Sequence, residues 1–236
     1  MALNPLTVGR ARVRAGSWRG RDDLAYLVPL TGAATLTTSS LAGIRDRLQR
    51  DGFTEVVTAA VGPSERDMFT ADGFTDREQL HLLRHDLKTN MPAPPERSDG
   101  IRRGTRRDHA EILTVDHDTF DEFWQLDVDG LREAIDATPI SRLRIIRADN
   151  AKIIGYAIAG RAGEHGYLQR LAVSPAAQGS GRGAALVSDT LHWLRRRGTT
   201  LAWVNTQEAN AAALRLYERL GFEPAGHRLT VLHRYL

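Results

Sequence analysis

The stretch QGSGRGAALVSDTL occupies residues 178–191. Glycine stands at positions 179, 181 and 183, and an apolar helical pattern follows directly. The first turn of a helix exposes about four unpaired N–H groups at the positive end of the helix dipole, which together can bind an anion. Glycine lets the backbone turn sharply and approach a phosphate without a Cβ clash. The stretch therefore predicts either a phosphate site at a helix start or a flexible loop before an ordinary helix.

Two common phosphate-binding patterns do not fit this stretch. A P-loop needs a lysine and a hydroxyl residue after its last glycine, and neither is present. Gly179, Gly181 and Ala184 match the loose dinucleotide pattern G-x-G-x-x-G/A. The dinucleotide-binding fold requires an acidic residue about 20 positions further on, at the end of the next strand. Here the strand ends in Val204-Asn205-Thr206, and it lies too near the end of the sequence for a six-stranded sheet.

Residues 101–236 predict an alternation of strands and helices. Alternating apolar patterns at 142–147 and 152–159 flank Asp149-Asn150, which predicts a hairpin. A strand at 167–173 should end before Pro175, because proline cannot donate to a strand ladder. The predicted order is strand, two helices, three strands, helix, strand, helix and two closing strands. The remaining elements are expected at 101–105, 107–115, 130–137, a helix ending at 197, 201–204 and 210–220.

The two halves of the sequence resemble each other weakly. In both, a helix ends near a glycine, an apolar strand follows, a short helix closes on Gly-Phe, and a strand comes last. Gly52 and Gly198 lie 146 positions apart, and Gly73 and Gly221 lie 148 apart. This spacing predicts an internal duplication. The first copy has TGAATLTTSSL (31–41) where the second has its glycine-rich turn, so the first copy should lack the site.

Two motifs in the second half resemble those of the GNAT family of N-acetyltransferases. Gln178 to Gly183 matches R/Q-x-x-G-x-G/A, which in that family lies between a strand and a helix and binds acetyl-CoA. The stretch NTQEANAAALRLYERLGFEPAG (205–226) is similar to the family's second motif. The likeness covers roughly residues 100–236. The residues of the second motif that stand in register are Asn210, Tyr217, Gly221 and Phe222.

The resemblance implies the fold class and the domain organisation. The expected fold is α/β (α+β), with a mixed, mostly antiparallel, twisted sheet flanked by helices. Some bacterial members of the family carry tandem domains with one degenerate copy. The expected parts are a degenerate, partial GNAT-like domain at 1–90, a linker at 91–100 and a catalytic domain at 101–236.

The resemblance also implies which residues bind the cofactor. Backbone groups of Leu171, Ala172 and Val173 would pair with the pantetheine arm as a strand partner does. Asn210 would hydrogen-bond this arm, and it is also suited to cap the following helix. The family often has arginine where Gln178 stands. Glutamine at this position lacks the positive charge but leaves the backbone N–H groups of the turn in place. The implied cofactor-binding turn is Gln178, Gly179, Ser180, Gly181, Arg182, Gly183 and Ala184, with N–H groups from 179 onward at the pyrophosphate.

Acetyl transfer also requires proton transfer, and Tyr217 is the candidate acid for the departing thiolate. Alternatively, Tyr217 is a packing residue whose hydroxyl bonds to the backbone. The resemblance places segment 117–131 (HDTFDEFWQLDVDGL) over the acceptor side, where its carboxylates and aromatic rings would line a pocket or simply pack. The general base stays undecided among five residues, or a water chain. These five are Asp118, Glu122, Glu164, His165 and Glu208.

Composition limits the classes of function. The chain has 236 residues, a net charge of +3, 42% hydrophobic residues and no cysteine, so thiolate metal sites, disulfides and cysteine nucleophiles are excluded. Basic residues are scattered among 29 acidic ones, which argues against nucleic-acid binding. No apolar run reaches the roughly 18 residues of a membrane span. We therefore expect a cytoplasmic protein with no metal, no nucleic-acid partner and no membrane contact.

The leading prediction is an acetyl-CoA-dependent N-acetyltransferase. It would move an acetyl group to a primary amine on a small molecule or a protein, by direct transfer in a ternary complex. The alternative is a catalytically weak sensor that binds acyl-CoA, or a protein-interaction module. Neither the acceptor, the acyl chain length nor the oligomeric state follows from the sequence.

Overall fold

The computed structural model describes residues 3–95 and 100–236. Contacts between residues divide the chain into two units. Unit 1 comprises Met1–Leu82, Asn205–Asn210 and Ala225–Leu236, and unit 2 comprises Leu83–Val204 and Ala211–Pro224. Within the described ranges, no helix is both long and apolar enough to cross a membrane.

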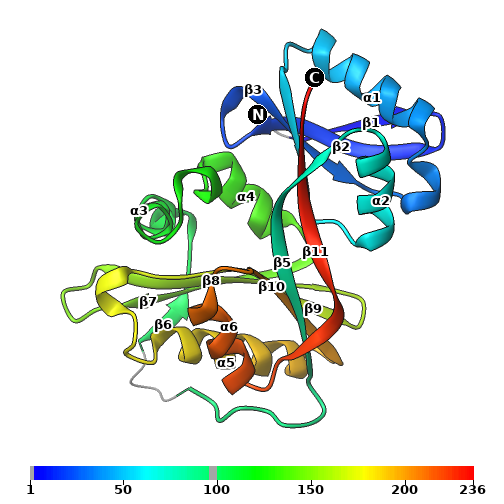
Figure 1. Ribbon diagram of the computed structural model, residues 1–236. Coiled ribbons are helices and arrows are strands. Elements are labelled where there is room, and N and C mark those ends of the chain that lie inside the picture. The colour runs from blue at the N-terminus through cyan, green and yellow to red at the C-terminus, as the bar shows by residue number, and fades with distance from the viewer. Residues whose placement is uncertain (1–2, 96–99) are drawn as a thin grey trace. The chain divides into compact units, whose positions relative to one another are not determined.

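Unit 1 is a small sheet with two helices (Figure 1). Its strand order is β1-β2-β3-β4-β11-β5. Strands β3 and β4 pair in parallel, whereas the pairs β1–β2, β2–β3 and β4–β11 are antiparallel. Buried side chains of both helices, such as Leu41, Ile44 and Phe69, join one core cluster with strand residues such as Val13 and Leu27. Its elements are β1 (Asn4–Val8), β2 (Ala11–Trp18), β3 (Arg21–Pro29), η1 (Ala33–Thr35), α1 (Thr38–Arg50), β4 (Glu55–Thr58), α2 (Pro63–Ala71), the first part of β5 (Thr75–Asp86) and most of β11 (Glu223–Tyr235).

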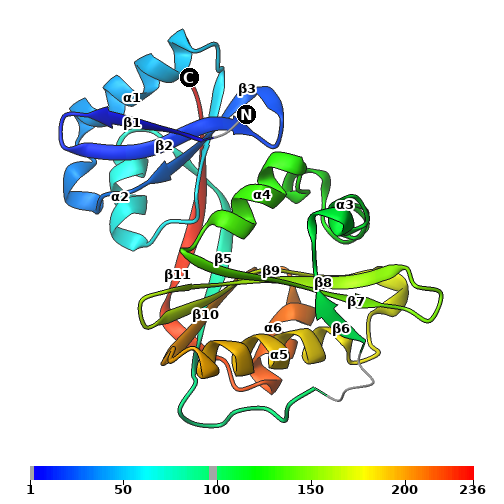
Figure 2. The same cartoon turned by 180° about the vertical axis from the view of Figure 1, so that it is seen from behind.

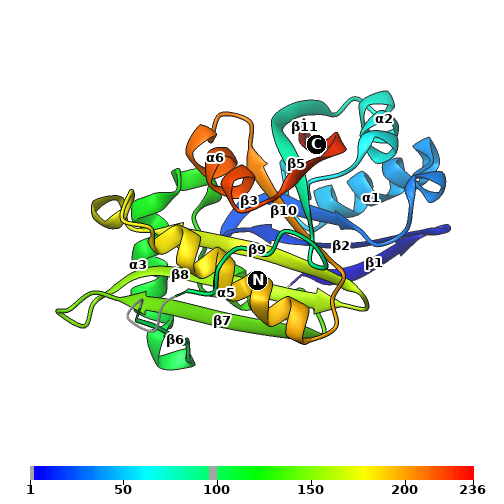
Figure 3. The same ribbon diagram turned by 90° about the horizontal axis from the view of Figure 1, so that it is seen from below.

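Unit 2 is a sheet with helices on both faces. Helices α3 and α4 cover one face and α5 and α6 the other (Figures 1 and 2). Seen from the α5 side, α5 lies along strands β7 to β9 (Figure 3). Its elements are β6 (Ile101–Arg103), η3 (Arg106–Asp108), α3 (His109–Thr119), η4 (Glu122–Trp124), α4 (Val128–Asp136), β7 (Ile140–Arg147), β8 (Ile153–Ala162), β9 (His165–Val173), η5 (Pro175–Ala177), α5 (Arg182–Arg196), β10 (Leu201–Gln207) and α6 (Ala211–Arg219).

The strand order of unit 2 is β10-β9-β8-β7-β6, antiparallel except for the parallel pair β9–β10. The expected fold class, a mixed and mostly antiparallel sheet flanked by helices, is confirmed. The predicted elements of this half lie within a few residues of the observed ones. One expectation is wrong: β11 is a single strand of 13 residues rather than two closing strands.

The two units exchange segments of chain. Strands β5, β10 and β11 each begin in one unit and end in the other. Leu83 and Leu87 from the first half of the sequence are buried in the core of unit 2, and Leu232 is buried in that of unit 1. Each unit therefore contains residues from both halves of the sequence. The predicted domains, 1–90 and 101–236, are instead two continuous stretches joined by one linker.

The predicted linker has two parts. Its residues 91–95 are described, and His192 and Ser188 of α5 bond to the carbonyl oxygens of Pro92 and Ala93 at 2.9 and 2.5 Å. Residues 96–99 lie outside the described residues.

Unit 1 repeats part of the order of unit 2. In both, an antiparallel strand pair leads into a helix, a parallel strand and a second helix. Unit 1 also has β2 and β3, which the sequence comparison of the halves did not include. At the start of α1, however, the Thr37 hydroxyl accepts a hydrogen bond from the Ser40 N–H at 3.2 Å. The first copy therefore satisfies its helix N-terminus with its own side chain.

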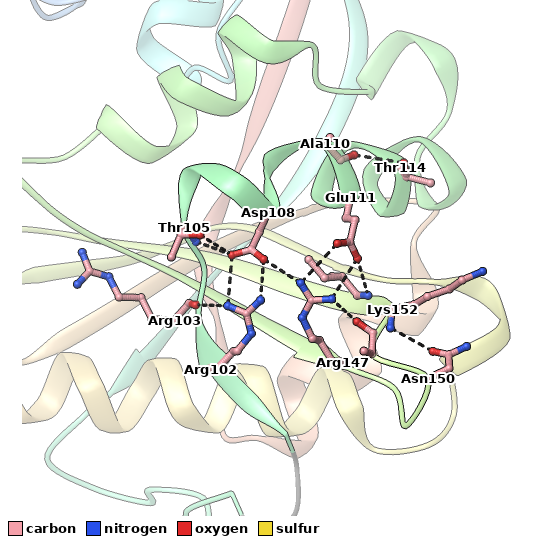
Figure 4. Close-up of polar contacts among 12 residues, drawn as sticks. Arg102, Arg103, Thr105, Asp108, Ala110, Glu111, Thr114, Arg147, Asn150 and Lys152 are labelled. Atoms are coloured by element: carbon pink, nitrogen blue, oxygen red, sulfur yellow. Dashed lines mark hydrogen bonds and ion pairs between the residues drawn. The ribbon is translucent and has the colours of Figure 1, made fainter.

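A network of charged residues fixes the start of α3 to the sheet (Figure 4). Asp108, which is 4% exposed, accepts hydrogen bonds from Arg102 at 2.6 Å, Arg147 at 2.9 Å, and the Thr105 N–H and hydroxyl at 2.8 Å. The hydrogen bond from Arg102 is the main reason that the pKa of Asp108 lies well below its usual range. The start of α3 is thereby tied to β6 and β7.

Candidate active site

The glycine-rich turn opens α5 as the sequence predicts. Strand β9 ends at Val173, and residues 174–181 lead into the helix. Gly179 has φ +76° and Gly181, the N-cap, has φ +82°. A Cβ at either position would lie within 4 Å of no atom of the described residues other than its chain neighbours. Glycine is therefore needed here for its left-handed backbone rather than for lack of space, and the surroundings of the turn are open.

The hydrogen bonds of α5 begin after its first residues. The first bond runs from the Ala185 N–H to the Gly181 carbonyl at 3.0 Å, so the N–H groups of Gly183 and Ala184 precede it. The N-cap residue, Gly181, has no side chain that could accept from these N–H groups, and the first turn holds no acidic residue. These N–H groups and the positive end of the helix dipole suit an anion.

Side chains of the turn brace it against β9. The Gln178 side-chain amide donates to the Val173 carbonyl at 3.0 Å, and the Ser180 hydroxyl donates to the Ala177 carbonyl at 2.5 Å. Gln178 stands where arginine is frequent in the family that the sequence resembles. Its neutral amide holds the turn to the end of the strand.

Strand β9 has an open stretch of edge next to this turn. Strand β10 pairs with β9 over three residues, ending at Trp203 and Tyr167, while β9 continues to Val173. The Ser174 N–H bonds to Ile154 of β8 at 2.8 Å. In an antiparallel strand pair, every second residue directs its backbone N–H and C=O to the partner strand. Ala172, two residues before Ser174, therefore also directs its backbone groups to β8, whereas Leu171 and Val173 direct theirs to the other edge of β9. Of the three predicted strand residues, two therefore present backbone groups to that edge.

Tyr217 lies on α6, beside the start of α5. It is 5% exposed and belongs to the buried cluster that includes Val173, with its ring 5.6 Å from that of Phe222. A Cβ at Gly183 would lie 3.3 Å from Leu216, the neighbour of Tyr217, so α6 and the first turn of α5 are closely packed. Burial raises the pKa of Tyr217, which keeps its hydroxyl protonated at neutral pH.

Asn210, the last predicted cofactor residue, immediately precedes α6, and its N–H donates to Gln207 at 3.0 Å. It belongs to unit 1, whereas the other predicted site residues belong to unit 2.

The candidate bases belong to different elements of the fold. Glu164 and His165 stand at the start of β9, the end opposite the glycine turn, and His165 accepts a hydrogen bond from the Trp203 indole at 3.1 Å. Glu208 pairs with Arg228 at 2.5 Å and belongs to unit 1. Asp118 and Glu122 are exposed on segment 117–131. Among the described residues, no three His, Cys, Asp or Glu side chains gather as metal ligands would.

A buried network in unit 2 was not predicted from the sequence. Asp116 of α3 is fully buried and accepts hydrogen bonds from Tyr156, from the Leu126 N–H and, twice, from Arg170 of β9. The only signal in the sequence is an acidic residue on the apolar side of a helix and an arginine within an apolar strand. Neither indicates its partner, because they are 54 positions apart.

Comparison with known proteins agrees with this geometry. Residues 109–222 match the Acetyltransferase (GNAT) family. These residues form a GNAT-family acetyltransferase domain. The match contains β9, the glycine turn, α5 and Tyr217, and it ends at Phe222.

Two relatives share the domain at moderate identity. A mycothiol acetyltransferase of Gordonia bronchialis is 31% identical over 206 residues, covering 81% of this chain and 65% of the relative. The ribosomal protein bS18-alanine N-acetyltransferase of Escherichia coli is 37% identical over 76 residues, covering 32% of this chain and 51% of the relative. The chain thus spans less than two thirds of either relative.

Solved structures share the fold over nearly the whole chain. A tandem GNAT protein from the clavulanic acid biosynthesis pathway has a TM-score of 0.67 at 14% identity, covering 95% of this chain and 78% of that one. A GCN5-related N-acetyltransferase from Sphaerobacter thermophilus has a TM-score of 0.65 at 17% identity, covering 95% and 76%. At these identities the likeness concerns the fold, which is that of GNAT proteins.

Proposed function

We propose that this protein is an acetyl-CoA-dependent N-acetyltransferase that moves an acetyl group to a primary amine by direct transfer in a ternary complex. One observation carries the proposal. The N-terminus of α5 has no side-chain cap, opens on left-handed glycines, and follows directly after a strand with an open edge. This combination lies within the residues that match the family.

The glycine turn and the end of β9 fit two parts of acetyl-CoA, its pyrophosphate and its pantetheine arm. The N–H groups from Gly181 to Ala184 bind the pyrophosphate, and the loop from Gln178 keeps them in place. The backbone of Leu171 binds the pantetheine arm, as an added strand would bind. The Val173 carbonyl already accepts a hydrogen bond from Gln178, so the N–H is its available group. Asn210 is proposed to bond to the same arm.

Acetyl-CoA supplies a thioester whose acetyl group is activated for attack. In the proposed mechanism the Val173 N–H donates to the acetyl carbonyl oxygen and stabilises the negative charge that develops there. Holding amine and thioester in one complex removes the entropy cost of their encounter. Tyr217 donates its proton to the departing thiolate, for which its raised pKa makes it suitable as an acid at neutral pH.

The acceptor loses one proton during the transfer. A lysine-like amine has a pKa near 10.4, so it must be deprotonated before it attacks. Glu164, His165 and Glu208 are poor candidates for this step in view of their positions or partners. We propose that a water chain, or a carboxylate of segment 117–131, removes the proton.

The names of the two relatives guide the choice of acceptors. One acts on mycothiol and the other on the alanine of a ribosomal protein, so the acceptor class includes both a small molecule and a protein. We propose a primary amine as the shared chemistry. We further propose that residues 101–236 carry the activity and that residues 1–90 are a degenerate copy, since Thr37 caps the helix that corresponds to α5.

A turnover experiment tests the proposal. The purified chain is incubated with acetyl-CoA and either a peptide that begins with alanine or a small-molecule primary amine, and mass spectrometry detects the acetylated acceptor. Transfer that needs the chain and is slowed in Tyr217→Phe supports the enzyme. Binding of acetyl-CoA without transfer to any amine supports the alternative, an acyl-CoA sensor. A folded chain that does not bind acetyl-CoA refutes both.

A further inference from the structure

Strand β9 contains an irregularity that changes which face its side chains occupy. Arg170 is opposite Ile158 on β8, but Leu168 is opposite Ala159, so Gln169 is an extra residue. Such a bulge interrupts the alternation of a strand. Leu168 and Val173 belong to the core on the α5 face, whereas Ala172 belongs to the core with Ile112 of α3. Without the bulge, Leu168 would share the face of residues 170 and 172.

The bulge therefore directs Arg170 toward α3 and segment 117–131. Its guanidinium makes two hydrogen bonds to Asp116, at 2.8 and 2.9 Å, and a third to the Trp124 carbonyl at 2.7 Å. The guanidinium carbon also lies 3.5 Å from the centre of the Phe120 ring. One side chain of β9 thus contacts the segment at Phe120 and Trp124 and also holds Asp116, the residue just before it.

Asp116 completes this attachment. It is fully buried, and such a carboxylate is stable only when its oxygens accept enough hydrogen bonds. Besides Arg170, its donors are the Tyr156 hydroxyl of β8 and the Leu126 N–H of the segment, the latter at 2.7 Å. The network therefore joins α3, the segment and two central strands.

Segment 117–131 also reaches the proposed acetyl site directly. The Thr119 hydroxyl approaches the Val173 carbonyl at 3.4 Å, the same oxygen that accepts a hydrogen bond from Gln178. Arg170 is next to Leu171 in sequence, at the point where β9 presents its open edge. A shift of Arg170 would therefore move the segment relative to that edge.

We infer that Arg170, Asp116 and Tyr156 are positioning residues that set where the acceptor amine lies relative to the acetyl group. They act through segment 117–131 and touch neither the cofactor nor the reacting atoms. The inference rests on the proposed N-acetyltransferase function. It predicts that the network governs recognition of acceptors large enough to contact the segment, and leaves acetyl-CoA binding unaffected.

Arg170→Lys is the test variant, because lysine keeps the charge but cannot make the paired hydrogen bonds. Arg144→Lys is the matched control: Arg144 is a half-buried arginine of β7 that pairs with Asp189 at 3.1 Å, away from segment 117–131. Tyr156→Phe removes a single donor to Asp116 and carries the same test if Arg170→Lys does not fold. The large acceptor is the peptide that begins with alanine, and hydroxylamine is the small nucleophile.

For Arg170→Lys we expect the KM of the large acceptor to rise about tenfold or more, and Tyr156→Phe to act in the same direction with a smaller effect. The Kd of acetyl-CoA and the enzyme-dependent rate with hydroxylamine should change less than about twofold in both variants and in Arg144→Lys. Hydrogen exchange should accelerate in residues 117–127 of Arg170→Lys and not in α5.

Equal KM values in wild type and both network variants would overturn the inference. So would a parallel loss of acetyl-CoA affinity or hydroxylamine rate, since a general structural defect predicts that result. A wild-type chain that binds no acetyl-CoA, or transfers acetyl to no amine, refutes the proposed function instead, and the inference with it.

Discussion

Gly181 allows the anion site to be separated from the stability of the fold. An L-residue at its left-handed φ of +82° costs about 1–2 kcal/mol. Among the residues that the structure describes, no atom beyond the chain neighbours lies within 4 Å of the position that a Cβ would take, so steric clash adds nothing. Gly181→Ala should therefore lower the free energy of unfolding by about 1–2 kcal/mol and leave the N–H groups accessible.

Gly181→Glu carries the same backbone strain with an added carboxylate. A negative charge at a helix N-terminus is stabilising by about 0.3–1 kcal/mol, so this variant should be at least as stable as Gly181→Ala. Its carboxylate competes with the pyrophosphate and repels it by about 1–4 kcal/mol at 4 Å, for effective dielectric constants between those of water and a protein surface. The Kd of acetyl-CoA should therefore be about fivefold to several hundredfold higher than for Gly181→Ala.

Urea unfolding and calorimetric titration of acetyl-CoA measure the two effects on the same samples. The alanine variant is the control, because it shares the strain and lacks the charge. Equal Kd values for the two variants would refute the anion site at residues 181–184. A glutamate variant that is less stable than the alanine variant by more than about 1 kcal/mol would contradict an exposed helix N-terminus without a cap.

Three further predictions follow from other residues. Tyr217→Phe should lower kcat by about a hundredfold with little change in the Kd of acetyl-CoA, because it removes the proposed acid; an unchanged kcat in steady-state assays would leave Tyr217 a packing residue. Asp116→Ala should lower the free energy of unfolding in urea by about 3–5 kcal/mol, since it leaves the largely buried Arg170 without its counter-charge, and a loss below about 1 kcal/mol would contradict this. Asp108 has a lowered pKa, so its stabilisation is present at neutral pH and is lost as the pH falls below about 4, where the unfolded chain takes up the proton. The difference in stability between wild type and Asp108→Asn should therefore be constant above about pH 5 and shrink in acid, and a difference independent of pH would contradict it.

Local signals explain why the backbone of the glycine turn could be predicted. The turn from Gln178 to Ala184 is a local structure, and left-handed glycines before an apolar helix specify it with few alternatives. The same holds for Pro175 after β9 and for the hairpin between β7 and β8. Their conformations depend on neighbours within a few positions, so the residues alone are sufficient.

The exchange of strands between the units could not be predicted in this way. Residues 225–235 show the alternation of a strand, and alternation gives the face of each side chain but not the neighbouring strand. Their partner is β4, as in the pair His233 and Val57, which are 176 positions apart. The choice depends on which sheet edge the tertiary structure brings next to these residues.

The sequence by itself determined the family motifs, the order of most elements in residues 101–236, the turn that opens α5 and the residues proposed to bind acetyl-CoA. The tertiary structure alone decided that Arg170 reaches Asp116 and that α6 lies against the first turn of α5. It also decided that β9 is open beyond Tyr167. The physical reason is the range of the interactions: caps, turns and periodicity act within a few residues. A bulge that turns a side chain to the other face, or a buried carboxylate that finds its donors, depends on residues that only folding brings together.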